Sequence, residues 1–379
     1  MITGLGQGGA EAMVEKLLAA GRRLDPEIVQ SVVSLGQAGV VGTRLRRAGF
    51  EVQALGFERR LLSPHHVFGF VRLMHTLRNS GADTVVQTWL WHADLLGGIC
   101  ARLGGNRKVV WNLRNSMPQL ASTGRLSRAT AAVCARVSRW LPARIVCNSE
   151  AALLAHTAVG YDASRCVVIP NGFDLQRFAP SAQAGERIRA NWHARSGELF
   201  VGMVARIDPQ KDHATFIRAA HSVAAALPAV RFVLVGTGVT QEPALRTLLA
   251  QLFLESRFIL EERREDMPDV MRALDVFCLA SRSEGFPNVI GEAMACGTPT
   301  IATDAGDARG IIDDDRLVAA VGDADGLAAC LLRVLSLSAS ERLALGLAQR
   351  QRIAQRFDID QVWLGYRDLY RSLCQPGRR

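Results

Sequence analysis

The stretch VFCLASRSEGFPNVIGEAMACGTPTIAT, residues 276–303, contains a complete strand–loop–helix–strand unit. Residues 276–280 and 298–303 are short apolar or β-branched runs, which favour strands. Between them, Pro287 suits the first turn of a helix because it has no N–H to lose, and residues 288–296 carry a helical pattern that ends at a Gly-Thr-Pro turn. Strands joined by a crossover helix pair in parallel, so this unit predicts a parallel α/β sheet.

The same alternation of strand and helix patterns extends along nearly the whole chain and predicts an α/β fold with two doubly wound, Rossmann-like parallel sheets. The boundary is expected at the Pro-Asn-Gly turn of residues 170–172, which gives a first domain over 1–172, a second over 173–356, and a terminal helix over 357–379. The remaining strands are expected at 28–36, 50–56, 83–88, 108–113, 144–148, 166–170, 199–206, 231–236, 257–260 and 316–319, with residues 2–5 forming a strand cut short.

Composition places the chain among globular proteins of the cytoplasm. Its 379 residues, 49% of them hydrophobic, are too many for one ordinary core and indicate two domains. No apolar run approaches the ~18 residues that cross a bilayer, and the start lacks the pattern of a secretory signal. The eight cysteines show no paired spacing, which is typical of buried thiols in a reducing compartment.

The excess of positive over negative side chains is confined to the first half of the chain. Residues 1–180 hold 21 Lys and Arg against 11 Asp and Glu, a net charge of +10, while the rest of the chain carries −1. Two interpretations stay open: a face that contacts anionic lipid or a polyanionic glycan, or a solvated surface rich in arginine. Nucleic acid fits less well, because no binding motif accompanies the charge. The clusters are Arg44/Arg46/Arg47, Arg59/Arg60, Arg72/Arg78 and Arg125/Arg128/Arg136/Arg139/Arg144.

Two glutamates flank the loop of the opening stretch. Glu284 falls in the loop and Glu292 on the following helix. A loop through Gly285 and Phe286 at the carboxyl end of a parallel strand presents backbone N–H groups and a helix N-terminus, which suit an anion. Carboxylates beside such a site serve to accept hydrogen bonds from hydroxyls, so a ligand with hydroxyls at both ends of a diphosphate, such as a nucleotide sugar, is indicated.

A second constellation follows the strand over 199–206. It ends in Arg206, and Lys211 comes five positions later across a proline turn, so both cations are expected at the same sheet edge. Only three of the 45 basic residues are lysines, and Lys211 is the one in its half. A lysine kept in a chain that otherwise uses arginine indicates that a compact positive charge is needed, for example to bind a phosphate.

These features together resemble the family 4 retaining glycosyltransferases of GT-B architecture. The resemblance spans nearly the full chain and also rests on GLGQGGAE (4–11), IPNGFD (169–174) and VLVGTG (233–238). It implies two Rossmann-like domains facing a cleft, with the C-terminal helices crossing back to the first domain. The donor would be a nucleotide-diphospho-sugar, with no cofactor and no metal, and the acceptor a glycan or polyprenyl-linked glycan.

The resemblance also implies roles for single residues. Arg206 and Lys211 would hold the diphosphate, and Glu292 the ribose hydroxyls. The sugar would contact Glu284 and the loop of Gly285, Phe286, Pro287 and Asn288, while Gly6, Gly8 and Gly9 of the first domain would close over the phosphates. The chain departs from the family pattern after the fourth strand of the first domain, where Arg114 stands in place of a histidine. Either Arg114 or His92 takes the acceptor-side role.

Three alternatives remain at this point. A nucleotide-sugar epimerase shares the two-domain plan but is expected to have more carboxylates and histidines in its site. A dehydrogenase would use Gly4-x-Gly6-x-x-Gly9, which matches a dinucleotide fingerprint literally, although such a match alone is weak. A binding protein without activity would not need both cations and both glutamates.

Three Asp-x-Asp-like pairs, at 313–315, 323–325 and 358–360, do not follow a strand in the way a metal site requires and are interpreted as loop and capping residues.

Overall fold

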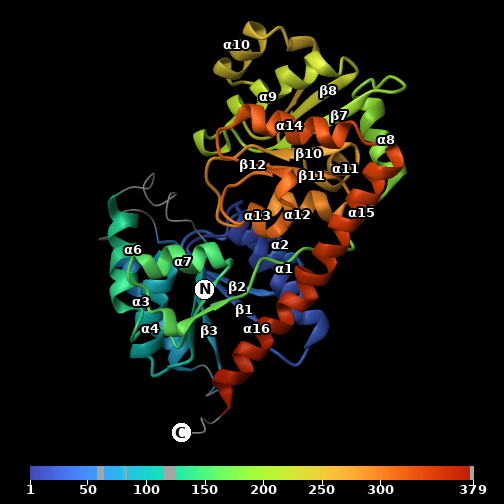
Figure 1. The fold of residues 1–379 in the computed structure, drawn as a ribbon. Coiled ribbons are helices and arrows are strands. Elements are labelled where there is room, and N and C mark those ends of the chain that lie inside the picture. The colour runs from blue at the N-terminus through green and yellow to red at the C-terminus, as the bar shows by residue number, and fades with distance from the viewer. Residues whose placement is uncertain (58–63, 80, 82, 115–124, 376–379) are drawn as a thin grey trace. The chain divides into compact units, whose positions relative to one another are not determined.

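The computed structural model describes residues 1–57, 64–79, 81, 83–114 and 125–375 (Figure 1). The chain divides into two compact units: the first comprises Met1–Gly172 and Ile359–Arg379, and the second Phe173–Asp358. Two arginines of the basic clusters, Arg59 and Arg60, lie outside the described residues, as does the side chain of Arg125. Among the described helices, none is both long and apolar enough to span a membrane.

The first unit contains a parallel sheet in two hydrogen-bonded pieces, ordered β1-β2 and β3-β4-β5-β6. Ile2, in the short strand expected at residues 2–5, joins the pieces because it forms parallel bridges to both Ser34 of β1 and Trp89 after β3. The strands are β1 (Ser31–Ser34), β2 (Glu51–Ala54), β3 (Val86–Gln87), β4 (Val109–Leu113), β5 (Arg144–Cys147) and β6 (Cys166–Val168).

Helices cover both faces of this sheet, each over its own apolar cluster. Side chains of α1, α2 and α16 share one cluster, which contains Trp363 and Tyr366 of the last helix, so α16 packs beside α1. Side chains of α3, α4, α6 and α7 share the other, around Trp91 and Trp111. The helices are α1 (Gly9–Leu24), α2 (Gly39–Arg47), α3 (Pro64–Arg78), α4 (Trp91–Leu103), α6 (Arg125–Val137), α7 (Glu150–Ala158), η1 (Ala163–Arg165) and α16 (Ile359–Cys374).

The second unit contains a six-stranded parallel sheet in the order β12-β11-β10-β7-β8-β9. All of β10 and all of β8 except Arg231 are buried, and both strands are largely apolar, as expected for strands covered on both faces. The strands are β7 (Leu199–Val204), β8 (Val230–Val235), β9 (Phe258–Glu261), β10 (Val276–Leu279), β11 (Thr300–Thr303) and β12 (Val318–Ala319).

The helices of this unit pack on both faces of the sheet around one large core. They are α8 (Ala182–Asn191), η2 (Pro209–Lys211), α9 (His213–Ala226), α10 (Pro243–Gln251), η3 (Glu255–Arg257), α11 (Met267–Arg272), α12 (Asn288–Ala295), α13 (Ala308–Ile312), η4 (Asp315–Leu317), α14 (Ala324–Leu335) and α15 (Ala339–Arg356). The predicted α/β class with two parallel, doubly wound sheets is confirmed. Several strands are shorter than expected because residues at their ends have no ladder partner.

Candidate functional site

The two constellations predicted from the sequence flank the point where the sheet of the second unit reverses its strand order. From β7 the chain proceeds outward through β8 and β9, and then returns to place β10 on the other side of β7. The loops after β7 and β10 therefore diverge at the carboxyl edge of the sheet. In open parallel sheets this position is where ligands bind.

The loop after β7 is shaped by two aspartates. Asp208 accepts a hydrogen bond from the backbone N–H of Gln210 at 3.0 Å and starts the short turn η2. Asp212 adopts a left-handed conformation with φ of 48° and caps α9 through Thr215. This local chemistry places Lys211 at the end of a tight turn, directly before the helix.

The loops after β7 and β10 are bound to each other through Arg282. Its backbone N–H donates to the carbonyl oxygen of Gln210 at 2.7 Å, and its guanidinium Nε donates to Asp212 Oδ2, also at 2.7 Å. Because the carboxylate of Asp212 is buried, the pair fixes one loop against the other.

Lys211 and Glu284 form an ion pair at this junction. Lys211 Nζ lies 2.5 Å from Glu284 Oε1, and Ser281 Oγ donates to the same oxygen at 2.6 Å. Only 18% of the Lys211 side chain and 8% of the Glu284 side chain are exposed, so the charges interact in a partly desolvated place. No described residue donates to the second carboxylate oxygen, Oε2, which leaves it as an acceptor for a hydroxyl.

Arg206 does not join this pair. Its side chain is 64% exposed and its guanidinium contacts Asp208 Oδ2 at 2.7 Å. The expected cations therefore follow the same strand, but each has its own carboxylate partner. A phosphate that approached Arg206 would meet a solvated guanidinium already paired with Asp208, whereas Lys211 is largely buried beside Glu284.

The segment from Gly285 to Asn288 connects β10 to α12. Phe286 is buried and its ring stacks on that of Phe173, with centroids 6.1 Å apart. Asn288 is the first residue of α12, as the pattern over 288–296 predicted, and Pro287 occupies the N-cap position without a side-chain hydrogen bond. Glu292 lies on α12 and is half-buried.

Backbone contacts hold this segment from the side of β11. The N–H of Asp307 donates to the carbonyl oxygen of Gly285 at 3.1 Å. Gly306 has φ of 61°, and a Cβ atom there would lie 2.5 Å from the carbonyl oxygen of Glu284. A glycine is therefore required for the close approach that positions Glu284.

The loop after β8 presents backbone N–H groups that the sequence motifs did not single out individually. Glu262 accepts hydrogen bonds from the N–H groups of Gly238 and Thr240, at 3.0 and 3.1 Å. These bonds, with one from the Thr240 hydroxyl, hold the pKa of Glu262 below its usual value. Its position directly after β9 was a signal available in the sequence, whereas its contact with the turn after β8 was not.

The first unit has an equivalent reversal of strand order, between Ile2 and β3. The loop after Ile2 contains Gly6, Gly8 and Gly9, and it enters α1 with Gly8 as N-cap and no side-chain cap. A Cβ at Gly6 would meet no atom within 4 Å. The loop therefore brings glycine backbone to the start of a 16-residue helix, where N–H groups attract negative charge. The chain's own Glu11 carboxylate already lies beside Gly8 there.

The turn after β3 carries a strained residue two positions before the predicted histidine. Leu90 adopts φ of 73° and ψ of 148°, a region that glycine alone visits readily, at a cost of about 1–3 kcal/mol. Buried tryptophans on both sides, Trp89 and Trp91, hold the turn in this form. His92 follows on the first turn of α4; it is half-buried, makes no hydrogen bond with the described residues, and its burial lowers its pKa.

Arg114 is buried at the end of β4, and its guanidinium is fully engaged by neutral groups. Nε donates to Asn112 Oδ1 at 2.6 Å, the terminal nitrogens donate to Asn171 Oδ1 and Tyr366 Oη, and the plane lies 4.6 Å from the centroid of the Trp89 ring. Burial lowers the pKa of Arg114. Arg114 therefore braces β4 against α16, and of the two residues considered for the acceptor side, His92 is the accessible one.

The aspartate pairs have local structural roles. Asp313 contacts Arg352, Asp314 starts η4, Asp323 caps α14 and Asp360 contacts Arg23. Within the described part of the chain, no group of three His, Cys, Asp or Glu side chains is arranged to hold a metal ion.

Family profiles match both units. Residues 7–177 match the family described as Glycosyltransferase Family 4, and residues 198–337 match that described as Glycosyl transferases group 1. The first match begins after Ile2 and covers β1 to β6, and the second covers β7 to β12 with the strand reversal of the second unit. Together the matches leave out residues 1–6, 178–197 and 338–379, and with them α8, α15 and α16.

Curated relatives are also glycosyltransferases by name. The chain is 29% identical over 262 residues to the UDP-Gal:α-D-GlcNAc-diphosphoundecaprenol α-1,3-galactosyltransferase of Escherichia coli, which is 66% of this chain and 66% of the relative. It is 28% identical over 332 residues to EpsF of Bacillus subtilis, covering 80% of this chain and 78% of the relative. A D-inositol 3-phosphate glycosyltransferase of Rhodococcus erythropolis is 35% identical over 172 residues, covering 43% of this chain and 38% of the relative.

Solved structures share the fold along the full length. Anabaena Alr3699/HepE in complex with UDP superimposes with a TM-score of 0.82 at 21% identity, over 98% of both chains. The sucrose-phosphate synthase of Thermosynechococcus elongatus gives 0.69 at 20% identity, over 92% of this chain and 96% of that one. At these identities the likeness concerns the fold alone.

Proposed function

Since this chain belongs to the family 4 glycosyltransferases and has the GT-B architecture, we propose that it transfers a hexose-type sugar, with retention of the anomeric configuration, from a nucleotide-diphospho-sugar to a glycan or lipid-linked glycan. The observation that carries the proposal is the Lys211–Glu284 pair at the strand reversal of the second unit. It combines a held positive charge with a carboxylate oxygen that remains open to a hydroxyl.

The donor fits this chemistry. Lys211 and Arg206 supply positive charge for a diphosphate, and the open N-terminus of α12 adds backbone N–H groups. Glu284 Oε2 accepts from a hydroxyl of the sugar, and Glu292 from the ribose. The HepE structures hold UDP and UDP-glucose, which makes a uridine nucleotide the first donor to test.

The proposed step uses no protein nucleophile. The bond between the anomeric carbon and the diphosphate oxygen breaks while the acceptor hydroxyl oxygen bonds to the same carbon from the same face. The proton of that hydroxyl passes to the departing phosphate, so the products are the glycoside and a nucleoside diphosphate. Lys211 stabilises the charge that develops on the leaving group, which is the largest contribution expected in such a site.

On the acceptor side we assign His92 a positioning role. Its lowered pKa keeps the imidazole neutral at pH 7, so it can accept or donate a hydrogen bond without adding charge. The strained turn at Leu90 sets its direction. Arg114 has no comparable freedom because Asn112, Asn171 and Tyr366 occupy it.

The acceptor class is inferred from chemistry and from the relatives. The basic excess of the first half fits an anionic or membrane-borne acceptor, and the E. coli relative is named for a diphosphoundecaprenol-linked substrate. We therefore place the reaction in the synthesis of a cell-surface polysaccharide at the cytoplasmic face of the membrane. The relatives named above give no support to the epimerase or the dehydrogenase alternative.

A thermal-unfolding panel with UDP, GDP, ADP, their sugar conjugates and NAD tests the donor assignment. A ligand at ~100 times its dissociation constant adds ~2.7 kcal/mol to the folded state, which is readily measured. We expect one nucleoside diphosphate and its sugar conjugate to stabilise the wild type and to lose most of this effect in Glu292→Ala.

The matched control is Glu186→Ala, an exposed glutamate on α8. It should respond to the nucleotide as the wild type does. Stabilisation by NAD alone would refute the transferase assignment and favour the dehydrogenase. Once a donor is known, the anomeric configuration of the product, measured by NMR, decides retention.

A further inference from the structure

We propose that the outer face of α6 and the turn that follows it form a docking surface for an anionic lipid membrane. We call it the Trp140 surface and define it by Leu126, Val133 and Trp140 together with Arg128, Arg136 and Arg139. This inference deepens the proposed function by naming the partner through which a lipid-linked acceptor is reached.

The apolar side chains of this surface are exposed and lie on one stripe. Leu126, Val133 and Trp140 are 57%, 45% and 60% exposed. With Ala129 and Arg136 they follow a spacing of three and four residues, so they share one side of the helix and its continuing turn. The neighbouring α4 adds exposed Leu96, Ile99 and Leu103.

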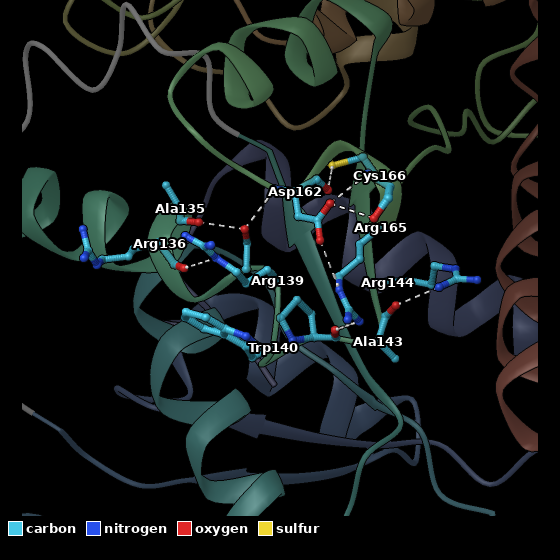
Figure 2. A network of polar contacts seen from close by, with 12 residues as sticks. Ala135, Arg136, Arg139, Trp140, Ala143, Arg144, Asp162, Arg165 and Cys166 are labelled. Carbon is cyan, nitrogen blue, oxygen red and sulfur yellow. Dashed lines mark hydrogen bonds and ion pairs between the residues drawn. The ribbon is translucent and has the colours of Figure 1, made fainter.

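Trp140 is held outward by contacts to its backbone. Arg102 of α4 donates to the carbonyl oxygens of Trp140 and Leu141. Arg165, which Figure 2 shows near the same turn, donates to the carbonyl oxygen of Pro142 at 2.8 Å. The guanidinium of Arg139 lies 4.6 Å from the centroid of the Trp140 ring. A large apolar ring is thus presented to solvent on a fixed turn with a cation on its face, as at membrane interfaces.

The charge around this ring is not neutralised by the protein. Residues 91–166 hold ten Lys and Arg but three Asp and Glu. Of these acids, Asp94 is buried and Asp162 contacts Arg165. Within the described residues, Arg128, Arg136, Arg139 and the nearby Arg144 form no ion pair with a carboxylate; Arg139 and Arg144 donate to backbone oxygens. The arginines of the Trp140 surface are therefore available to a negatively charged partner.

A membrane fits both properties at once. Apolar side chains enter the boundary between head groups and acyl chains, while arginines beside them contact anionic head groups. A soluble polyanion would satisfy the arginines but leave the stripe of Leu126, Val133 and Trp140 in water. The combination therefore favours anionic lipid over a free glycan.

Vesicle co-sedimentation tests the proposal directly. We compare phosphatidylcholine vesicles with vesicles that also contain phosphatidylglycerol, using the wild type and the variant Arg128→Gln/Arg136→Gln/Arg139→Gln. Binding should require the anionic lipid and fall on the order of 100-fold in the variant. The control variant, Arg195→Gln/Arg218→Gln/Arg333→Gln, removes the same charge from exposed arginines of the second unit and should bind nearly as the wild type does.

Tryptophan fluorescence locates the surface. The other five tryptophans are at most 4% exposed, so quenching by acrylamide reports on Trp140. Anionic vesicles should protect this emission from acrylamide and expose it to quenching by brominated lipid, and Trp140→Phe should remove both effects.

Three results would overturn the proposal: equal binding to neutral vesicles, equal loss in both triple variants, or binding that leaves Trp140 open to acrylamide. Binding of soluble dextran sulfate without binding of vesicles would also overturn the proposal, and it would indicate that the partner is a polyanionic glycan. None of these measurements uses donor or turnover. Nucleotide stabilisation of the arginine variant, measured separately, distinguishes failure of the docking surface from failure of the transferase assignment.

Discussion

The two units reverse their strand order in the same way but equip the reversal with opposite chemistry. In the second unit, Lys211 and Glu284 place paired charges there, next to the solvated Arg206. In the first unit, the reversal carries bare glycine backbone and the imidazole of His92, whose pKa is lowered by burial. The nearby cation, Arg114, is buried among neutral partners.

This difference teaches that topology selects where a ligand binds, whereas side chains select what binds. A charged reversal suits a diphosphate and its developing charge. In the first unit, the start of α1 suits a negatively charged group through its backbone N–H groups, while the imidazole of His92 suits a hydroxyl, which it can orient without adding charge. Each of the following predictions alters one side of this comparison.

The largest effect is expected at Lys211. Lys211→Met should lower turnover by on the order of 10²-fold or more, because the charge on the leaving group loses its fixed partner. The free energy of unfolding should also fall, by about 1–3 kcal/mol, since Glu284 is left buried without its cation. Release of nucleoside diphosphate and chemical denaturation measure the two effects.

The double variant Lys211→Met/Glu284→Gln separates the effect on turnover from the effect on stability. Removing both charges should restore most of the lost stability but none of the turnover. Recovery of turnover in the double variant would mean that Lys211 serves only to neutralise Glu284.

An intermediate effect is expected at Gly306. Gly306→Ala should destabilise the second unit by about 2–4 kcal/mol, because it combines a left-handed backbone with a close contact to the Glu284 carbonyl oxygen. Gly322→Ala is the matched control: its φ is 77°, but its Cβ would meet no atom within 4 Å, so about 1 kcal/mol is expected. Equal losses, measured by denaturant titration, would argue against the contact.

The smallest effect concerns Asp94, on α4 two residues after His92. Burial, only partly offset by hydrogen bonds from Thr88 and the Asn112 N–H, raises its pKa from 3.8 to about 8. A group with a raised folded pKa contributes stability below its unfolded pKa and loses it as pH rises, so stability should decline between about pH 4 and 8. Asp94→Asn, which mimics the protonated carboxyl, should flatten this slope and stabilise the protein at pH 8 relative to the wild type. An unchanged slope in thermal unfolding from pH 5 to 8 would place its cause elsewhere.

Much of the fold could be predicted from the sequence because parallel strands buried on both faces read as uninterrupted apolar runs. The run over 276–279 is a local pattern of this kind, and the helix that starts after Pro287 is another local pattern. The site could be located for the same reason, since Lys211 and Glu284 each follow such a strand. The details of the first unit escaped prediction, because Arg114 and Tyr366 meet across 252 residues of sequence and no local pattern records such a contact.

The sequence by itself therefore determined the elements of this protein, their alternation, and the residue types that follow each strand, because these depend on spacing and propensity. Only the tertiary structure decided which of those residues meet. It paired Lys211 with Glu284, buried Arg114 as a brace, strained Leu90 between two tryptophans and left Trp140 exposed. Burial, strain and ion pairing arise from distances between segments far apart in the chain, and these distances exist only once the sheets have formed.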